Sequence, residues 1–245
     1  MNQTWTDLEI LVGDDCPDDQ IARLCAVFGQ EDPRIRYIRN PEPRGRVANF
    51  CGLFEQARGE FIKYINDDDL IAPTCVERMV SALEVSPSAV LVSSLRHQID
   101  ASGVVLPPGP ANRALTSVDT YAEGRSMIDG ILGAEFNGLG EPTTVLFRRA
   151  DLAWAQPTML HIGDYQTDWN GDVVMWTNLL GRGDAIYLAE TLSSFRQHDE
   201  QVSARCDSAL RGYVDWARIR RAALDRGFVL DPAGGNVVAR PLRSA

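Results

Sequence analysis

Residues 61–70 read Phe-Ile-Lys-Tyr-Ile-Asn-Asp-Asp-Asp-Leu, a short apolar stretch that runs directly into three consecutive carboxylates. The first five residues are rich in β-branched and aromatic side chains, which predicts a strand over Phe61–Ile65. In an open α/β sheet, ligands bind in the crevice beyond the carboxyl ends of the strands. The acidic triplet Asp67–Asp69 therefore occupies the position at which such a sheet holds its ligand.

Strand and helix patterns alternate on both sides of this stretch. Short apolar runs predict strands, and apolar residues spaced three and four apart predict helices. The strands are predicted at Leu8–Val12, Ile35–Ile38 and Ala89–Ser93, and the helices at Asp18–Phe28, Arg46–Arg58 and from Pro73 onward. This alternation is typical of a parallel α/β sheet covered by helices.

The second half of the chain has a less regular pattern. Its predicted elements are a strand at Thr143–Phe147, a helix at Asp172–Leu180, a pair of strands at Ala185–Leu188 and Leu192–Phe195, and a helix at Ser208–Arg226. The last helix carries an apolar face made of Leu210, Tyr213, Val214, Ala217 and Leu224.

Composition narrows the class of protein. The 245 residues are 44% hydrophobic and 24% charged, which is typical of a globular protein and excludes a disordered chain. Because no apolar run approaches the roughly 20 residues that cross a bilayer, we expect no membrane span. The formal net charge of -10 argues against a nucleic-acid partner, which requires a basic face.

The cysteines indicate the compartment. They are odd in number, scattered and without a Cys-x-x-Cys pair, which predicts reduced thiols in a cytoplasmic protein and neither a disulfide framework nor a zinc site. The five are Cys16, Cys25, Cys51, Cys75 and Cys206.

The acidic triplet suggests a cation. Adjacent carboxylates repel one another, and a divalent cation offsets that repulsion most easily. Mg²⁺ or Mn²⁺ binds one or two protein carboxylates and fills its other positions with water and substrate phosphate oxygens. Asp14 and Asp15 form a second acidic pair at the end of the first predicted strand. The alternative for both clusters is structural, as polar turns and helix caps.

Five stretches of the chain, taken in order, closely resemble the family 2 glycosyltransferases of GT-A fold. They are Asp7-Leu-Glu-Ile-Leu-Val-Gly-Asp14-Asp15, Ala57-Arg-Gly-Glu-Phe-Ile-Lys-Tyr-Ile-Asn66-Asp67-Asp68-Asp69-Leu70-Ile-Ala-Pro73, Gly140-Glu141-Pro142-Thr143-Thr-Val-Leu-Phe-Arg148-Arg149, Gly171–Asp184 and Glu190–His198. The resemblance implies a Rossmann-like, mostly parallel sheet flanked by helices over residues 1–203. Within it, residues 1–95 would bind the nucleotide sugar and residues 96–203 the acceptor, and residues 204–245 would form a helical tail.

The same resemblance assigns roles around the donor. Asp68 falls on the metal-binding aspartate of the family, with Mn²⁺ or Mg²⁺ as the cation, and Asp67 and Asp69 flank it near the ribose or the second shell. Asn66 departs from the pattern, because many members carry Asp there. The other implied nucleotide-sugar-binding residues are Asp14, Asp15, Arg44, Asn49 and His198.

Asp172 falls on the catalytic base of the family. One carboxylate must take the proton of the acceptor hydroxyl as its oxygen attacks the sugar, and a single displacement inverts the anomeric configuration. Gly171 departs from the Glu-Asp pair common in the family, and Asp164 and Asp168 compete for the role. Asp172 also suits a structural role, because a carboxylate is favourable in the first turn of a helix.

The start of the chain differs from the family pattern. Members normally begin with a strand and a helix that precede Asn2-Gln3-Thr4-Trp5. Without that strand, Leu8–Val12 and Phe61–Ile65 must pair directly or leave backbone groups unsatisfied. The function implied is metal-dependent, inverting transfer from a nucleotide-diphosphate sugar to a glycan, lipid-linked or small-molecule acceptor. The alternatives are a degenerate, non-catalytic binding module and a nucleotidyltransferase.

Overall fold

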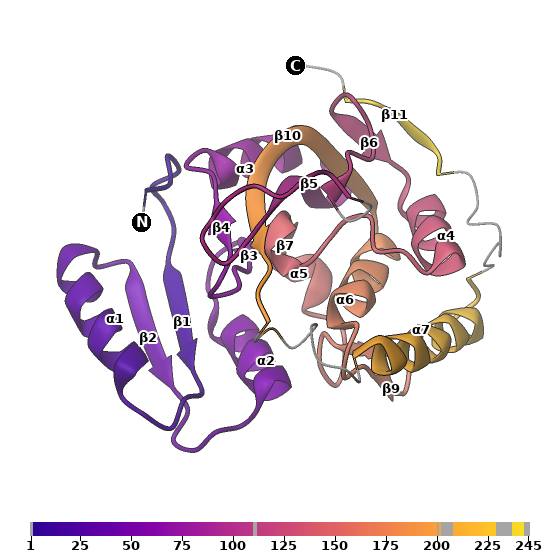
Figure 1. The fold of residues 1–245 in the computed structure, drawn as a ribbon. Coiled ribbons are helices and arrows are strands. Elements are labelled where there is room, and N and C mark those ends of the chain that lie inside the picture. Colours follow the sequence, from indigo (N-terminus) through magenta and orange to yellow (C-terminus); the bar gives the residue numbers. More distant parts are fainter. Residues whose placement is uncertain (1, 110–111, 200, 202–207, 229–236, 243–245) are drawn as a thin grey trace.

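The computed structural model describes residues 2–109, 112–199, 201, 208–228 and 237–242 (Figure 1). The predicted alternation of the first half is confirmed. Its elements are β1 (Ile10–Asp14), α1 (Gln20–Glu31), β2 (Ile35–Arg39), α2 (Arg46–Gln56), β3 (Phe61–Lys63), β4 (Leu70–Ile71), α3 (Cys75–Glu84) and β5 (Ala89–Ile99).

The second half adds shorter strands and three longer helices. Its elements are β6 (Thr120–Ala122), α4 (Gly124–Ala134), the 3₁₀-helix η2 (Pro142–Thr144), β7 (Val145–Arg148), α5 (Arg149–Leu152), β8 (His161–Ile162), β9 (Tyr165–Gln166), α6 (Gly171–Leu180), β10 (Asp184–Arg196), α7 (Ser208–Asp225) and β11 (Ala239–Pro241). The prediction of two final strands was wrong, because β10 runs continuously over 13 residues. Bulges between Leu188 and Ser193 interrupt its ladder with β5 and account for the broken sequence pattern.

The main sheet has seven strands in the order β11-β6-β10-β5-β7-β3, with β4 also paired to β10. The long β5–β10 ladder is parallel, as is the separate β1–β2 pair. The shorter strands join antiparallel at the two sides. Helices flank the sheet (Figure 1), so the predicted α/β class is confirmed.

β1 and β3 do not pair with each other. Among the described strands, β1 pairs with β2 and β3 pairs with β7. Figure 1 shows β1, β2 and α1 at one end of the molecule, with α2 between them and the main sheet. The Glu9 carboxylate bridges the two parts, because its Oε1 accepts hydrogen bonds from the backbone N–H groups of Arg58 (2.6 Å) and Gly59 (3.2 Å). A side chain therefore makes a connection that strand pairing does not make.

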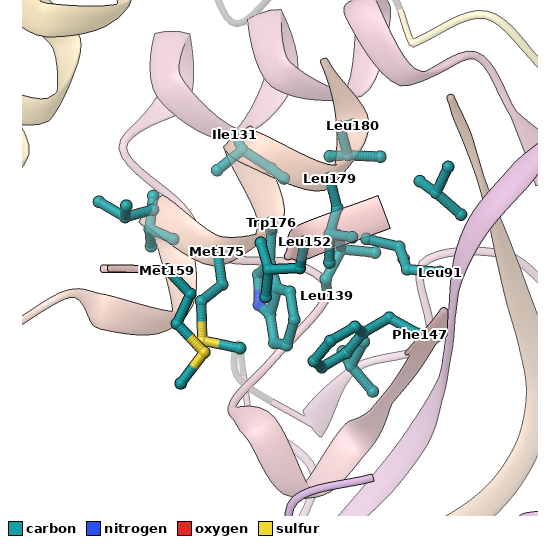
Figure 2. Packing of buried hydrophobic residues seen from close by; sticks show 14 of the residues in the cluster. Leu91, Ile131, Leu139, Phe147, Leu152, Met159, Met175, Trp176, Leu179 and Leu180 are labelled. Carbon is teal, nitrogen blue, oxygen red and sulfur yellow. The ribbon is translucent and has the colours of Figure 1, made fainter. Parts of the chain in front are cut away.

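The core surrounds α6, whose residues from Val173 to Leu180 are all buried. Figure 2 shows Trp176 at its centre, near Phe147, Leu152 and Met175. The Trp176 and Phe147 rings meet edge to face with centroids 6.3 Å apart. Because α6 is fixed on all sides, its first turn, which carries Asp172, is held rigidly.

Helix α7 buries the opposite face from the one that its apolar residues suggest. Leu210, Tyr213 and Leu224 are exposed, whereas Asp215 and Ile219 are buried. The Asp215 carboxylate accepts hydrogen bonds from the hydroxyls of Tyr165 and Thr167 and from the backbone N–H groups of Trp169 and Asn170. These four bonds attach the helix to the segment that precedes α6 and decide which face is buried.

Two further expectations concern cysteines and membranes. Cys16, Cys25, Cys51 and Cys75 are free thiols, and Cys206 lies outside the described residues. No helix in the described ranges combines the length and apolarity needed to cross a bilayer.

Candidate functional site

The Asp15 carboxylate organises the loop between β2 and α2. Its two oxygens accept hydrogen bonds from the backbone N–H groups of Arg44 (2.7 Å) and Gly45 (2.7 Å) and from the Asn40 amide (2.9 Å). The N–H of Arg44 is the main reason that the pKa of Asp15 lies below its usual value. The structure thus brings together Asp15 and Arg44, both predicted to bind the nucleotide sugar, at the carboxyl end of β1.

Asp14 and Asn49 lie in the same cluster. Asp14 is buried and accepts hydrogen bonds from the Tyr37 hydroxyl (2.6 Å) and from the N–H of Cys16 (2.8 Å). The Tyr37 bond is the main cause that lowers the pKa of Asp14. Asn49 donates to the carbonyl oxygen of Gly13 (3.2 Å), and its side-chain oxygen accepts from Asn40.

The three carboxylates after β3 have three different environments. Asp67 is exposed, Asp68 is half-buried and Asp69 is buried. Asp69 accepts hydrogen bonds from the Thr143 hydroxyl (2.6 Å), the Asn66 amide (2.9 Å) and the N–H of Arg196 (2.9 Å). Burial raises the pKa of Asp69, and these bonds oppose that rise. Asp69 therefore fixes the loop, while Asp68 is turned toward other groups.

Asp68 meets the end of β10. The Nε2 atom of His198 lies 3.1 Å from its Oδ2, and the Gln201 amide lies 3.4 Å from the same oxygen. The Arg196 guanidinium holds the backbone of this loop by donating to the carbonyl oxygen of Asp68 (2.7 Å). The structure thus places His198, which was predicted to bind the nucleotide sugar, beside Asp68 of the acidic triplet, whereas no sequence pattern indicated Gln201.

Asp172 lies in the first turn of α6. Its carboxylate accepts hydrogen bonds from the Asn137 amide (2.8 Å) and from the N–H of Val173 (2.8 Å). Burial raises the pKa of Asp172, and both bonds oppose the rise. Asp164 and Asp168, the competing aspartates, lie on the β8–β9 turn and on the loop before α6. Among the described contacts, the side chains of Asp164 and Asp168 make no set of hydrogen bonds like the one around Asp172.

A buried ion pair beside Asp172 was missed by the sequence analysis. Arg96 of β5 and Glu141, which precedes η2, approach to 3.0 Å between Nε and Oε2. Burial raises the pKa of Glu141 to about 7, although the Arg96 charge opposes this. A charged residue inside the apolar pattern of Ala89–Ile99 was the available signal.

The segment from Asn137 to Thr144 joins the two acidic groups. Thr143 donates to Asp69 at one end of the segment, and Asn137 donates to Asp172 at the other. Asp172 and Asp69, the chain neighbour of Asp68, are therefore each bonded to one end of a single short segment. Among the described residues, no group of three or more His, Cys, Asp or Glu side chains is arranged to hold a metal.

In an open α/β sheet, ligands bind in the crevice beyond the carboxyl ends of the strands, and carboxylates lie at such ends here, after β1 and β3. Comparison with known proteins gives the family. The family described as Glycosyl transferase family 2 matches residues 1–125, and the chain belongs to this family.

Known relatives agree with this membership. An uncharacterized protein of Mycobacterium tuberculosis is 26% identical over 242 residues, which cover 97% of this chain and 72% of the relative. The GalNAc(5)-diNAcBac-PP-undecaprenol beta-1,3-glucosyltransferase of Campylobacter jejuni is 39% identical over 69 residues, which cover 28% of this chain and 22% of that enzyme.

Two solved structures share the fold. Residues 1–349 of S. aureus TarS in complex with UDP-GlcNAc match with a TM-score of 0.64 and 16% identity, over 95% of this chain and 62% of that one. The mannosyltransferase PcManGT of Pyrobaculum calidifontis, in complex with GDP-Man and Mn2+, matches with a TM-score of 0.59 and 16% identity, over 91% and 62%. Apart from the mycobacterial protein, these relatives are matched over less than two thirds of their length.

Proposed function

We propose that this protein transfers a sugar from a nucleotide-diphosphate donor to an acceptor hydroxyl, with inversion at the anomeric carbon and with Mn²⁺ or Mg²⁺ as cofactor. One observation carries the proposal. The Asp172 carboxylate is hydrogen-bonded to Asn137 near one end of the segment 137–144, and Asp69, the chain neighbour of Asp68, is hydrogen-bonded to Thr143 near the other end, with His198 beside Asp68. Family membership and neighbours bound to UDP-GlcNAc and GDP-Man support it.

The residues present fit the cofactor. Asp68 offers one carboxylate, the kind of ligand that suits Mg²⁺ and Mn²⁺, and His198 lies beside it with one imidazole nitrogen. The oxygens of Asp69 are already committed to three donors, which leaves it a supporting role. A bound divalent cation would neutralise negative charge on the departing diphosphate.

The chain's own groups would perform the remaining steps. Asp14, Asp15, Arg44 and Asn49 would bind the nucleotide at the end of β1, and Asp67 would lie beside it. Asp172 would take the proton of the acceptor hydroxyl while the hydroxyl oxygen bonds to the anomeric carbon. The bond from that carbon to the diphosphate oxygen breaks in the same step, which inverts the configuration. Asn137 and the N–H of Val173 hold Asp172 in one orientation.

The test uses two donors, UDP-GlcNAc and GDP-mannose, each with and without Mn²⁺. We expect metal-dependent binding of at least one donor by calorimetry, and slow release of its nucleoside diphosphate with water as acceptor. NMR of the released sugar before mutarotation would show the inverted anomer. Metal-dependent binding without turnover would favour the non-catalytic alternative, and retention of configuration would contradict the inverting mechanism. The glycan, lipid-linked or small-molecule acceptor and the cytoplasmic location stay predictions.

A further inference from the structure

The Arg96–Glu141 pair is enclosed beside the proposed base. The side chains of Arg96 and Glu141 retain only 10% and 15% of their exposure. The second carboxylate oxygen of Glu141, Oε1, is buried and has no hydrogen-bond partner among the described residues. Burying an ion pair is costly unless its geometry is well satisfied, so an incompletely bonded pair adds little stability. A role other than stability would explain its presence.

The backbone of Gly140 connects the Arg96–Glu141 pair to Asp172. Gly140 has φ +90°, and a Cβ atom there would lie 2.5 Å from a guanidinium nitrogen of Arg96. Arg96 therefore packs directly on the Gly140 backbone. The Asn137 amide accepts from the N–H of Gly140 (3.1 Å) and donates to its carbonyl oxygen (2.9 Å), and the same amide group donates to Asp172.

Trp176 secures this arrangement from the core. Its indole N–H donates to the carbonyl oxygen of Gly140 at 2.9 Å. The connection from Arg96 to Asp172 thus runs through one packed backbone residue, Gly140, and one amide, Asn137. Gly140 and Asn137 are each held by hydrogen bonds. A displacement of Arg96 that moves Gly140 would therefore also move Asn137 and change the position of the Asp172 carboxylate.

The charges facing this cluster come from several elements. The positive charge of Arg96 acts on both Glu141 and Asp172, and the negative charges of Asp69 and Asp172 act on Glu141. The titratable groups around it are Lys63 of β3, Asp69 of the following loop, Arg96 of β5, Glu141, Asp172 of α6 and Tyr187 of β10. Arg96 and Lys63 are the two cations among these groups, and the charge of Arg96 acts on Asp172.

We propose that Arg96 and Glu141 form a positioning pair for Asp172, in which Glu141 holds Arg96 against Gly140 and the positive charge of Arg96 favours the Asp172 carboxylate, together with the hydrogen bonds from Val173 and Asn137. The inference rests on the proposed function, because it concerns the proposed base. Where Glu141 is ionised, it has a second effect of opposite sign, since its negative charge disfavours ionisation of Asp172. The two members of the pair therefore act on Asp172 in opposite directions.

Because Arg96 and Glu141 are expected to shift the pKa of Asp172 in opposite directions, a titration can test the proposal. The carboxyl carbons are followed by ¹³C NMR in protein labelled at Asp and Glu, and the Asp172 signal is assigned from an Asp172→Asn variant. In Arg96→Gln, we expect the pKa of Asp172 to rise by about one pH unit, because a nearby opposite charge is lost. In Glu141→Gln, we expect it to fall. Arg96→Lys keeps the charge and should restore most of the wild-type titration. Arg220→Gln, which breaks the Arg220–Glu135 pair elsewhere, should leave it unchanged.

Shifts of Asp172 in the same direction in Arg96→Gln and Glu141→Gln, or no shift in either, would overturn the proposal. If Arg96→Gln does not fold, Arg96→Lys and Glu141→Gln still decide the result, because a purely structural role predicts no fall in Glu141→Gln. The titration does not depend on turnover. Absent activity in the wild-type enzyme would therefore count against the proposed function, and an unmoved Asp172 would count against this inference.

Discussion

The imidazole Nε2 of His198 lies 3.1 Å from Oδ2 of Asp68, although 130 residues separate them in the chain. The contact is made because β10 runs parallel to β5 and ends beside the loop that follows β3. Arg196 fixes the approach by bonding the backbone of that loop. A carboxylate and an imidazole are thereby held at a distance that a cation with both as ligands would require.

The first prediction concerns this pair. Asp68→Ala should weaken Mn²⁺-dependent binding of the nucleoside diphosphate by about 10–100-fold, and His198→Ala should weaken it less, because the imidazole carries no fixed negative charge. Calorimetric titration of UDP and GDP with and without Mn²⁺ measures both effects. Asp199→Ala removes an exposed carboxylate next to His198 and serves as the control. Metal-dependent affinity that survives in Asp68→Ala would remove Asp68 from the metal site.

The second prediction separates Asp172 from its competitors. Asp172→Asn should lower turnover by about 10²–10⁴-fold while leaving the donor affinity within a factor of about three, because a general base acts on the acceptor proton. Asp164→Asn and Asp168→Asn should keep most of the activity. Release of the nucleoside diphosphate and donor calorimetry report the two quantities separately. Equal losses of turnover in the three variants would argue against a specific base.

Sequence reasoning placed the acidic residues after β1 and β3 but did not find every partner of these residues. Local pattern was sufficient to place Asp68 after a buried strand and Asp15 at the end of β1, since both follow from short-range periodicity. The pairing of Arg96 with Glu141 depends on a turn at Gly140 with positive φ, and the charge of Arg96 inside an apolar strand pattern did not by itself indicate which residue would be its partner. Periodicity also failed for α7, because the four hydrogen bonds of Asp215 outweigh the apolar stripe at Leu210 and Tyr213.

The third prediction follows from Asp215. Replacing it by Ala removes four hydrogen bonds and leaves their donors unpaired, which should lower the free energy of unfolding by about 2–4 kcal/mol. Urea denaturation measures the change. Asp225→Ala, at an exposed position of the same helix, should cost less than about 0.5 kcal/mol. A similar cost in both variants would mean that the buried network does not anchor α7.

The fourth prediction concerns the Glu9 bridge between the two sheets. Glu9→Ala removes the bonds to Arg58 and Gly59 and the ion pair with Arg36 (2.6 Å), so β1 and β2 should open locally without global unfolding. We expect the amides of Ile10–Asp14 to exchange about tenfold faster, which corresponds to about 1.4 kcal/mol. Hydrogen exchange read by mass spectrometry measures this. Glu42→Ala, at an exposed site of the same region, is the control, and equal protection in the two variants would contradict the bridge.

The fifth prediction is a pH dependence of stability due to Glu141. Because its pKa is about 7 in the folded protein and 4.5 in the reference state, folding binds a proton between these values. The stability that protonated Glu141 contributes is fully present below pH 4.5 and is lost as the pH rises through 7. The total loss in the free energy of unfolding is about 3 kcal/mol, of which about 2 kcal/mol falls between pH 5.5 and 8. Glu141→Gln cannot titrate and should lack this loss.

The stability of Glu141→Gln relative to wild type should therefore rise with pH, whatever its value at pH 5.5. Urea denaturation at four pH values from 5.5 to 8.5 gives the difference directly. Glu135→Gln provides the matched control, because Glu135 pairs with Arg220 at a partly exposed site, and its difference from wild type should stay flat. A flat profile for Glu141→Gln as well would show that Glu141 is ionised throughout this range and that Arg96 compensates fully for its burial.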